Sequence, residues 1–279
     1  MDLVFYDFET TGKEPHWDQI LQVGATKVSK EFNEIDTFEF RSRLKPGLIP
    51  SPFALAVNNT DYAKLIKTEC SHYEMLRKIE DKFTKWSPSI FIGYNSINFD
   101  EEFLRNSLFR ALLDPYLTSR NNNNRADLLE LLRTVDFFFP DTINIPVNNK
   151  NKKTFKLDQI APANSITHFA HDALGDVIAT KQLAKLISQR KPTFWHSFLE
   201  GSNKSLVYKV LSEEKIVFFC QTFFGKTTAI SGSFLFNHPI YKFPVLFDLN
   251  FDPRELVELN LRDLKDVYTG GQRFLKFVK

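Results

Sequence analysis

Residues 3–12, Leu-Val-Phe-Tyr-Asp-Phe-Glu-Thr-Thr-Gly, join an apolar run to two acids at its end, Asp7 and Glu9. The apolar run is typical of a buried β-strand. Successive side chains of a strand alternate between its two faces, so both acids point the same way. Two neighbouring carboxylates repel each other, and a hard divalent cation such as Mg²⁺ between them would remove that repulsion. The simpler interpretation is a strand end with two exposed acids.

The composition is that of a soluble globular protein. The chain has 279 residues, 43% hydrophobic and 25% charged, which allows one large domain plus a smaller one. The net charge is only +2, so any attraction to nucleic acid must come from a local patch. Cys70 and Cys220 lack metal-ligand spacing and are expected to be free thiols. Neither a signal peptide nor a membrane span is visible, which predicts a cytoplasmic protein without membrane association.

Strand and helix patterns alternate over the first 190 residues. Strands are expected at 3–9, 20–28, 34–44 and 90–94, and the first three follow so closely that they predict antiparallel hairpins. Amphipathic helices are expected at 71–86, 99–113, 127–135 and 173–187. After Pro192 the pattern changes to a helical connector at 194–210, short β-type runs at 215–251 and a charged helix at 253–265. The sequence therefore predicts an α/β domain followed by a small β-rich one.

Asp100, His171 and Asp176 extend the acidic pattern of the first strand. Asp100 stands where a strand turns into a helix, and ligands commonly gather at such strand ends. Residues five apart in a continuous helix point about 140° away from each other. For His171 and Asp176 to reach one cleft, the helix must therefore begin at Ala173, with Asp172 as its N-cap. Asp176 is then expected to be partly buried, which requires a partner or a metal.

Each of these residues alone has an ordinary explanation. Asp100 would favour a helix N-terminus through the macrodipole, and an isolated histidine such as His171 is usually a surface or satisfied residue. Together, Asp7-x-Glu9, Asp100 after a Gly-Tyr-Asn turn, and His171-x4-Asp176 resemble the DEDDh 3′-5′ exonuclease superfamily. Longer stretches resemble the bacterial exonuclease I family, namely 93–100, 114–116, 125–129, 155–157 and 170–173.

The resemblance runs from Tyr6 to about Pro192 and weakens beyond. It implies an RNase H-like mixed sheet flanked by helices over residues 1–192. A connector helix and a small β-rich, SH3-like domain would follow over residues 193–279. The family layout continues into a helical domain, whereas this chain ends at Lys279. The second domain is therefore expected to be shortened or incomplete, and high processivity is left open.

The resemblance also implies an activity. It is that of a 3′-to-5′ exodeoxyribonuclease, a hydrolase that degrades single-stranded DNA to 5′-mononucleotides, with a role in DNA repair. Two Mg²⁺ ions about 3.5–4 Å apart would clamp the scissile phosphate, and Mn²⁺ is expected to substitute. The implied metal ligands are Asp7, Glu9, Asp100 and Asp176, with Asp7 bridging both ions. His171 would take the proton from the attacking water. A monomer that also binds single-strand-binding protein is expected.

Substrate contacts follow less directly from the sequence. Lys156 stands where the family typically has an arginine; lysine keeps the charge but loses the bidentate phosphate geometry. Arg120 and Arg125 are further candidates to line the path of the strand. The residues expected to bind substrate are Glu9, Thr10, Thr11, Gly12, Arg105 and Lys156.

Two other functions stay open on the sequence alone. A proofreading or RNA-degrading relative would share the same five catalytic residues, so those residues cannot distinguish DNA from RNA. A catalytically inactive module that only binds single strands would keep the fold. An inactive copy need not retain all five residues, which argues against this last alternative.

Overall fold

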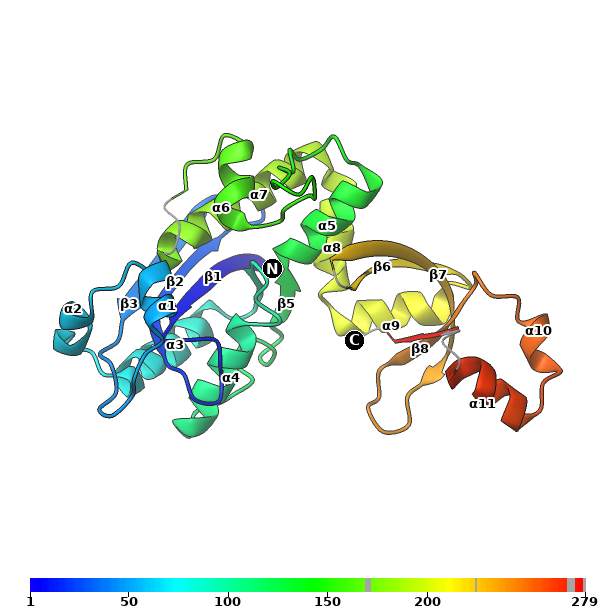
Figure 1. The fold of residues 1–279 in the computed structure, drawn as a ribbon, viewed down its shortest axis with the longest axis horizontal. Helices are drawn as coiled ribbons and strands as arrows, with labels where there is room; N and C mark the ends of the chain where they lie inside the picture. The colour runs from blue at the N-terminus through cyan, green and yellow to red at the C-terminus, as the bar shows by residue number, and fades with distance from the viewer. Residues whose placement is uncertain (169–171, 224, 270–273, 278–279) are drawn as a thin grey trace. The chain divides into compact units, whose positions relative to one another are not determined.

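The computed structural model describes residues 1–168, 172–223, 225–269 and 274–277 (Figure 1). The chain divides into two compact units, Met1–Ser202 and Asn203–Lys279. A five-stranded sheet lies in the first unit and a four-stranded sheet in the second. Among the described residues, no helix is both long and apolar enough to cross a membrane.

The sheet of the first unit has the strand order β3-β2-β1-β4-β5. β1, β2 and β3 are antiparallel neighbours, as their short connections require, whereas β4 is parallel to β1 and β5 to β4. This confirms the predicted mixed sheet, with β1 at its centre. The strands are β1 Asp2–Thr10, β2 Ile20–Val28, β3 Glu34–Arg41, β4 Ser89–Gly93 and β5 Asn124–Asp127.

Side chains alternate along β1 into two separate cores. Leu3 and Phe5 pack with α5, α6 and α7, while Val4 and Tyr6 pack with α3 and α4 on the other face (Figure 1). Asp7 continues the row of Leu3 and Phe5 toward α7. The helices of these layers are α3 His72–Trp86, α4 Asp100–Arg110, α5 Leu128–Phe138, α6 Leu157–Ala163 and α7 Ala173–Arg190.

The start of α7 agrees with the sequence prediction. Ala173 is its first residue, and the Asp172 side chain accepts a hydrogen bond from the Gly175 N–H at 3.2 Å. Asp127 caps α5 in the same way, and Ser71 and Glu74 form a capping box at α3. Such caps depend on residues two or three positions apart, so the sequence alone locates them.

The connector predicted at 194–210 is helical, but it consists of two helices, α8 Pro192–Gly201 and α9 Lys204–Glu213. The division occurs because the Asn203 side chain accepts N–H bonds from the first turn of α9. The charged helix predicted at 253–265 is divided in the same way. Asn260 accepts two N–H bonds and separates α10 Arg254–Val257 from α11 Leu261–Thr269. An N-cap residue inside a helical pattern begins a new helix.

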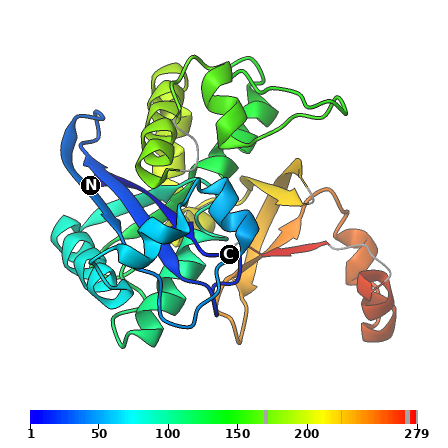
Figure 2. The ribbon, with the colours of Figure 1, turned by 60° about the vertical axis from the view of Figure 1, so that its left-hand side comes forward.

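The second unit confirms the predicted β-rich texture. Its strands pair antiparallel in sequence order (Figure 2), and the last of them was not predicted. The strands are β6 Val217–Phe223, β7 Lys226–Asn237, β8 Pro244–Asp248 and β9 Leu275–Phe277.

Several short elements of the first unit were also not predicted. β5 is four residues long, and α1 Pro52–Val57 and α2 Tyr62–Lys67 have six residues each. No residue of α1 is buried, and its sequence Pro-Phe-Ala-Leu-Ala-Val is apolar throughout, so it shows no alternation of apolar and polar faces. Elements this short show too little periodicity to be recognised from sequence.

Candidate active site

Three acids from two elements meet at the end of β1. Asp7 and Glu9 are two residues apart on that strand, and Asp176 comes from the first turn of α7. Each offers a carboxylate oxygen, and these oxygens all lie within 4.8 Å of one another. The predicted pairing of the strand acids with the helix acid is thus present in the structure.

Asp100 joins this group from the start of α4. β4 pairs with β1 only as far as Phe5, so the N–H of Phe8 lies beyond the reach of β4. The Asp100 carboxylate accepts this N–H at 3.0 Å and is itself 2% exposed. All four acids line one cavity of about 820 Å³.

The crowding of these acids perturbs their protonation. Burial raises the pKa of Asp7 well above its usual range, and the neighbouring carboxylates, Asp100 first, raise it further. Burial and then the charge of Asp176 raise the pKa of Glu9 to about 8, while Arg41 opposes the shift. Burial also raises the pKa of Asp100. Oxygen donors packed this closely suit a hard divalent cation, which would favour their ionised forms.

His171 lies outside the described residues, so its predicted place beside Asp176 is not described. His168, three residues earlier, instead contacts the Asp176 carboxylate through its Nε2 atom. The side chain of His168 is 2% exposed. Sequence reasoning missed His168, because no local pattern links it to Asp176 eight residues later.

The N-terminus of α7 is fixed to β2 and β3. The Asp172 carboxylate accepts hydrogen bonds from Gln22 Nε2 and Arg41 Nη2, each at 2.8 Å. A Cβ atom on Gly24 would lie 2.6 Å from the backbone of Ala173, so only glycine allows this close approach. These contacts hold the first turn of α7, and Asp176 with it, against the sheet.

A second carboxylate orders the turn before Asp100. Asp127, at the end of β5, accepts the backbone N–H groups of Asn95 at 2.9 Å and Ile97 at 3.1 Å. Asn95 has a φ of 61°, a left-handed conformation that asparagine tolerates better than most residues. The Gly-Tyr-Asn signature of the sequence therefore corresponds to a turn that directs Asp100 into the cavity.

The predicted residues after β1 divide into two groups. Thr10 and Gly12 line the cavity with the acids. Thr11 is fully buried, and its hydroxyl donates to Asp18 at 2.8 Å and accepts from the Gln19 N–H at 2.9 Å. The Thr11 side chain therefore supports the loop that follows β1.

The predicted basic residues have protein partners or lie outside the cavity lining. Arg105 pairs with Glu102, and Arg120 with Asp114. Arg125 Nη1 lies 3.0 Å from the carboxylate of Glu101. Lys156 is exposed and precedes the first turn of α6. Its neighbour Phe155 accepts a 2.6 Å hydrogen bond from the hydroxyl of Tyr94, which lines the cavity.

α1 supplies an apolar wall that sequence reasoning did not find. Phe53 and Val57 line the same cavity as the acids and are 83% and 50% exposed. The segment is attached to the strand end because Asn58 Nδ2 donates to the carbonyl of Thr10 at 3.0 Å. The Ser51 N–H donates to the carbonyl of Thr11 at 2.7 Å. The prolines of this stretch, Pro46, Pro50 and Pro52, are typical of a loop and give no sign of a helix.

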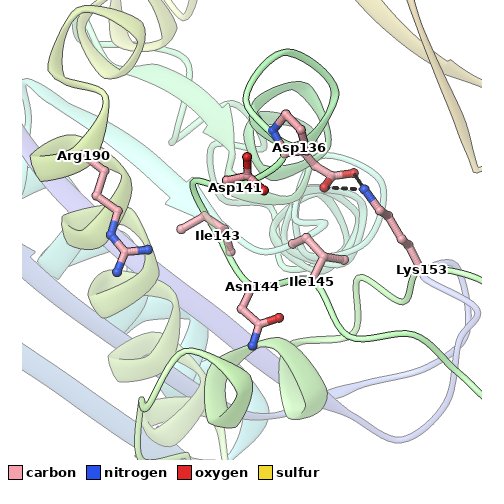
Figure 3. A pocket seen from close by; sticks show the side chains of 8 residues that line it. Asp136, Asp141, Ile143, Asn144, Ile145, Lys153 and Arg190 are labelled. Atoms are coloured by element: carbon pink, nitrogen blue, oxygen red, sulfur yellow. Dashed lines mark hydrogen bonds and ion pairs between the residues drawn. The ribbon is translucent and has the colours of Figure 1, made fainter.

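A second pocket, of about 360 Å³, lies beside the C-terminal end of α7 (Figure 3). Lys153 contacts both carboxylate oxygens of Asp136, at 2.7 and 2.8 Å, and Arg190, the last residue of α7, lies on the other side of the pocket. None of the four acids lines this pocket. Its charged groups balance one another, in contrast to the acidic cavity at the strand ends.

Comparison with known proteins identifies a family that this chain matches. The family model described as exonuclease (RNase T) matches residues 4–184. Exodeoxyribonuclease I of Buchnera aphidicola subsp. Baizongia pistaciae is 30% identical over 99% of this chain, which spans 60% of that protein's length. E. coli exonuclease I in complex with a dA16 oligonucleotide superposes with a TM-score of 0.83 at 28% identity, covering 99% of this chain and 63% of that one. A structure described as an ExoI/SSB-Ct complex gives a TM-score of 0.82 at 27% identity, with 99% and 63% covered.

Proposed function

This chain belongs to the exonuclease (RNase T) family, and from that premise we propose that it is a metal-dependent 3′-to-5′ exonuclease acting on single-stranded DNA. The observation that carries the proposal is the meeting of Asp7, Glu9 and Asp176 within 4.8 Å, with Asp100 in the same cavity. The product is a 5′-mononucleotide released from the 3′ end. The chemistry belongs to residues 1–192, followed over 193–279 by a connector and a small SH3-like domain.

Two divalent ions, proposed to be Mg²⁺ and replaceable by Mn²⁺, would supply the positive charge that stabilises the attacking and leaving oxygens at phosphorus. Asp7, Glu9 and Asp176 would hold them, with Asp7 shared and Asp100 on the second ion. His171 would accept the proton of the attacking water, which a group with an unperturbed pKa near 6.5 does well at neutral pH.

The shape of the cavity suits the end of a strand. Thr10 and Gly12 offer polar groups beside the acids, and Phe53 and Val57 offer an apolar surface on which a terminal base can lie. Lys156, next to the Tyr94–Phe155 hydrogen bond, is proposed to meet the phosphate backbone. Arg105 is proposed to contact the phosphate backbone as well, which requires its ion pair with Glu102 to open.

DNA and single-strand-binding protein are proposed as partners. The solved relatives include one described with a dA16 oligonucleotide and one described as an ExoI/SSB-Ct complex. This chain spans 60–63% of the length of the relatives compared. The transfer of their substrate and partner to this chain is therefore an inference from similarity.

One assay distinguishes this function from an RNA-degrading one. The protein is incubated with 3′- and 5′-labelled single-stranded DNA, matched RNA and duplex DNA, with Mg²⁺ or EDTA. The expected result is Mg²⁺-dependent stepwise shortening of single-stranded DNA from its 3′ end. Equal shortening of RNA would favour the exoribonuclease alternative. Absence of mononucleotide release would contradict the proposal. It would favour the alternative that the protein is a catalytically inactive module that only binds single strands.

Variants at Asp176 and Asp141 provide the matched pair for this assay. Asp176→Ala removes one of the three clustered carboxylates and is expected to abolish release. Asp141→Ala removes an exposed acid of the second pocket and is expected to leave release unchanged. An active Asp176→Ala variant would overturn the assignment of the cavity as the active site.

Variants at His171 and His168 separate proton transfer from metal binding. His171→Ala is expected to lower turnover about 10²–10⁴-fold, the usual contribution of a general base, with little change in metal affinity. His168→Ala removes a group bonded to Asp176, so it is expected chiefly to weaken metal binding. Turnover and the half-saturating Mg²⁺ concentration are measured for both. Equal loss of turnover and metal affinity in His171→Ala would contradict its role as base.

A further inference from the structure

Four polar side chains, three of them buried and Arg125 partly exposed, form one network: Tyr6, Glu101, Thr118 and Arg125. The Tyr6 hydroxyl donates to Glu101 Oε1 at 2.6 Å. Thr118 Oγ1 and Arg125 Nη1 donate to Glu101 Oε2 at 2.8 and 3.0 Å. Glu101 is 5% exposed and Tyr6 2%. None of these four residues lines the acidic cavity.

The network lies next to two of the proposed metal ligands. Tyr6 precedes Asp7 on β1 and points to the opposite face of the strand, and Glu101 follows Asp100 in the first turn of α4. The N–H of Phe8, on the other side of Asp7, donates to Asp100 at 3.0 Å. β1 is thus joined to the first turn of α4 both before and after Asp7.

Stability alone does not account for this arrangement. The Tyr6 ring packs against Phe83 and Phe91, with ring centroids 6.1 Å away in each case, and a phenylalanine would make the same contacts. The Glu101–Arg125 ion pair is a weak source of stability, because the arginine side chain is 36% exposed and solvent screens the attraction. What the polar groups add is direction, since a hydrogen bond fixes distance and angle where apolar packing does not.

We propose that Tyr6 and Glu101 are positioning residues that set the separation between the carboxylates of Asp7 and Asp100. This inference rests on the proposed two-metal function. In-line displacement needs two ions about 3.5–4 Å apart, so the carboxylates that hold them have little tolerance for displacement. Arg125 holds the Glu101 carboxylate in place from β5, and the hydrogen bond of Tyr6 transmits that position to β1.

The test compares Tyr6→Phe with Thr118→Val. Tyr6→Phe removes the link between β1 and Glu101 but keeps the ring, whereas Thr118→Val removes a different hydrogen bond from the same carboxylate. Mn²⁺ binding to each metal-free protein is measured by isothermal titration calorimetry without DNA. The half-saturating Mn²⁺ concentration for nucleotide release and the thermal midpoint in EDTA are measured beside it.

Tyr6→Phe is expected to weaken binding of the second Mn²⁺ about tenfold, the lower end of what partners of metal ligands contribute. The half-saturating Mn²⁺ concentration should rise by the same factor, and Thr118→Val should change neither quantity. Similar thermal midpoints for the two variants would show that lost stability is not the cause. Glu101→Gln, which keeps size but loses the charge, should show the same direction of change.

Two results would overturn the positioning role while leaving the proposed function intact. One is unchanged Mn²⁺ affinity in Tyr6→Phe alongside an active wild-type protein. The other is an equal loss of affinity in Thr118→Val, which would point to general loosening of the network. A wild-type protein that binds no Mn²⁺ and releases no nucleotide would overturn the proposed function, and the positioning role with it.

Discussion

Glu9 shows at the scale of one residue how a site can be built against stability. Its carboxyl is 9% exposed and has Asp176 as a neighbour, and its pKa of about 8 means that the metal-free protein holds a proton there at neutral pH. A cation must displace that proton to bind. Burial and the charge of Asp176 make an ionised Glu9 unfavourable in the metal-free protein, and a bound cation would remove that penalty.

The metal-free protein is expected to lose stability as the pH rises from about 4.5 to about 8. In that window the folded Glu9 retains a proton that the unfolded chain has released, so the free energy of unfolding falls with pH. One such proton contributes a slope of about 1.4 kcal/mol per pH unit. Thermal or urea unfolding in EDTA at several pH values measures it, and Glu9→Gln should reduce the slope.

Adding Mg²⁺ should recover stability most at the upper end of this window, where the smallest fraction of Glu9 still holds a proton that the ion must displace. Glu14→Gln, which removes an exposed acid from the lining of the same cavity, is the matched control. A slope that Glu9→Gln leaves unchanged would contradict the assignment of the titrating group.

α7 shows at the scale of an element how a helix start can position a ligand one turn away. Asp172 caps the helix, contacts Gln22 and Arg41, and precedes Asp176 by four residues. The cap therefore holds the helix end and fixes its place on the sheet at the same time.

Asp172→Ala is expected to lower the free energy of unfolding by about 1 kcal/mol, the usual effect of losing an N-cap. It should also lower nucleotide release, because the first turn of α7 loses its contacts with β2 and β3. Ser71→Ala is the matched control, since it removes the cap of α3 away from the cavity. Unfolding and release are measured for both, and equal effects on release would contradict the positioning of α7.

Gly93→Ala should disturb the turn that leads to Asp100. The added Cβ would lie 2.4 Å from the Ser96 Cβ and 3.1 Å from the Tyr6 carbonyl oxygen, so the turn must move. The expected cost is about 1–3 kcal/mol, as for other overpacked sites, together with weaker metal binding. Gly201→Ala, where a Cβ meets open space, should change neither. Thermal unfolding and Mn²⁺ titration compare the two, and wild-type behaviour of Gly93→Ala would contradict the tight packing.

At the scale of the whole molecule, the first unit contains the two large hydrophobic cores and all four acids of the cavity, Asp7, Glu9, Asp100 and Asp176. Every residue of the two large cores that sandwich the sheet lies within Met1–Ser202. The proposed chemistry therefore does not depend on the residues of the second unit for its framework.

Residues 1–202 produced alone are expected to unfold cooperatively and to keep Mg²⁺-dependent nucleotide release from a short oligonucleotide. The physical reason is that the apolar area that stabilises the sheet is buried within this unit. Thermal unfolding and release, beside the full chain, measure both. A fragment that folds but releases nothing would place part of the active site in the second unit.

Local patterns anticipated much of this fold. The second strand has the predicted bounds Ile20–Val28, and α7 begins at the predicted Ala173, because alternation and capping depend on residues only a few positions apart. The resemblance to bacterial exonuclease I is likewise confirmed by the family match and the structural neighbours. The division of the helical connector into α8 and α9 at Asn203 was not predicted.

The sequence by itself determined which residue types could meet a cation, namely the acids Asp7, Glu9, Asp100 and Asp176, and on which elements they lie. Only the tertiary structure decided their partners. His168 at Asp176, Phe53 in the cavity wall and Glu101 behind Tyr6 are contacts between segments that the chain order does not pair, the last spanning 95 residues. Their physical cause is packing of separate elements around one sheet, which no local pattern encodes.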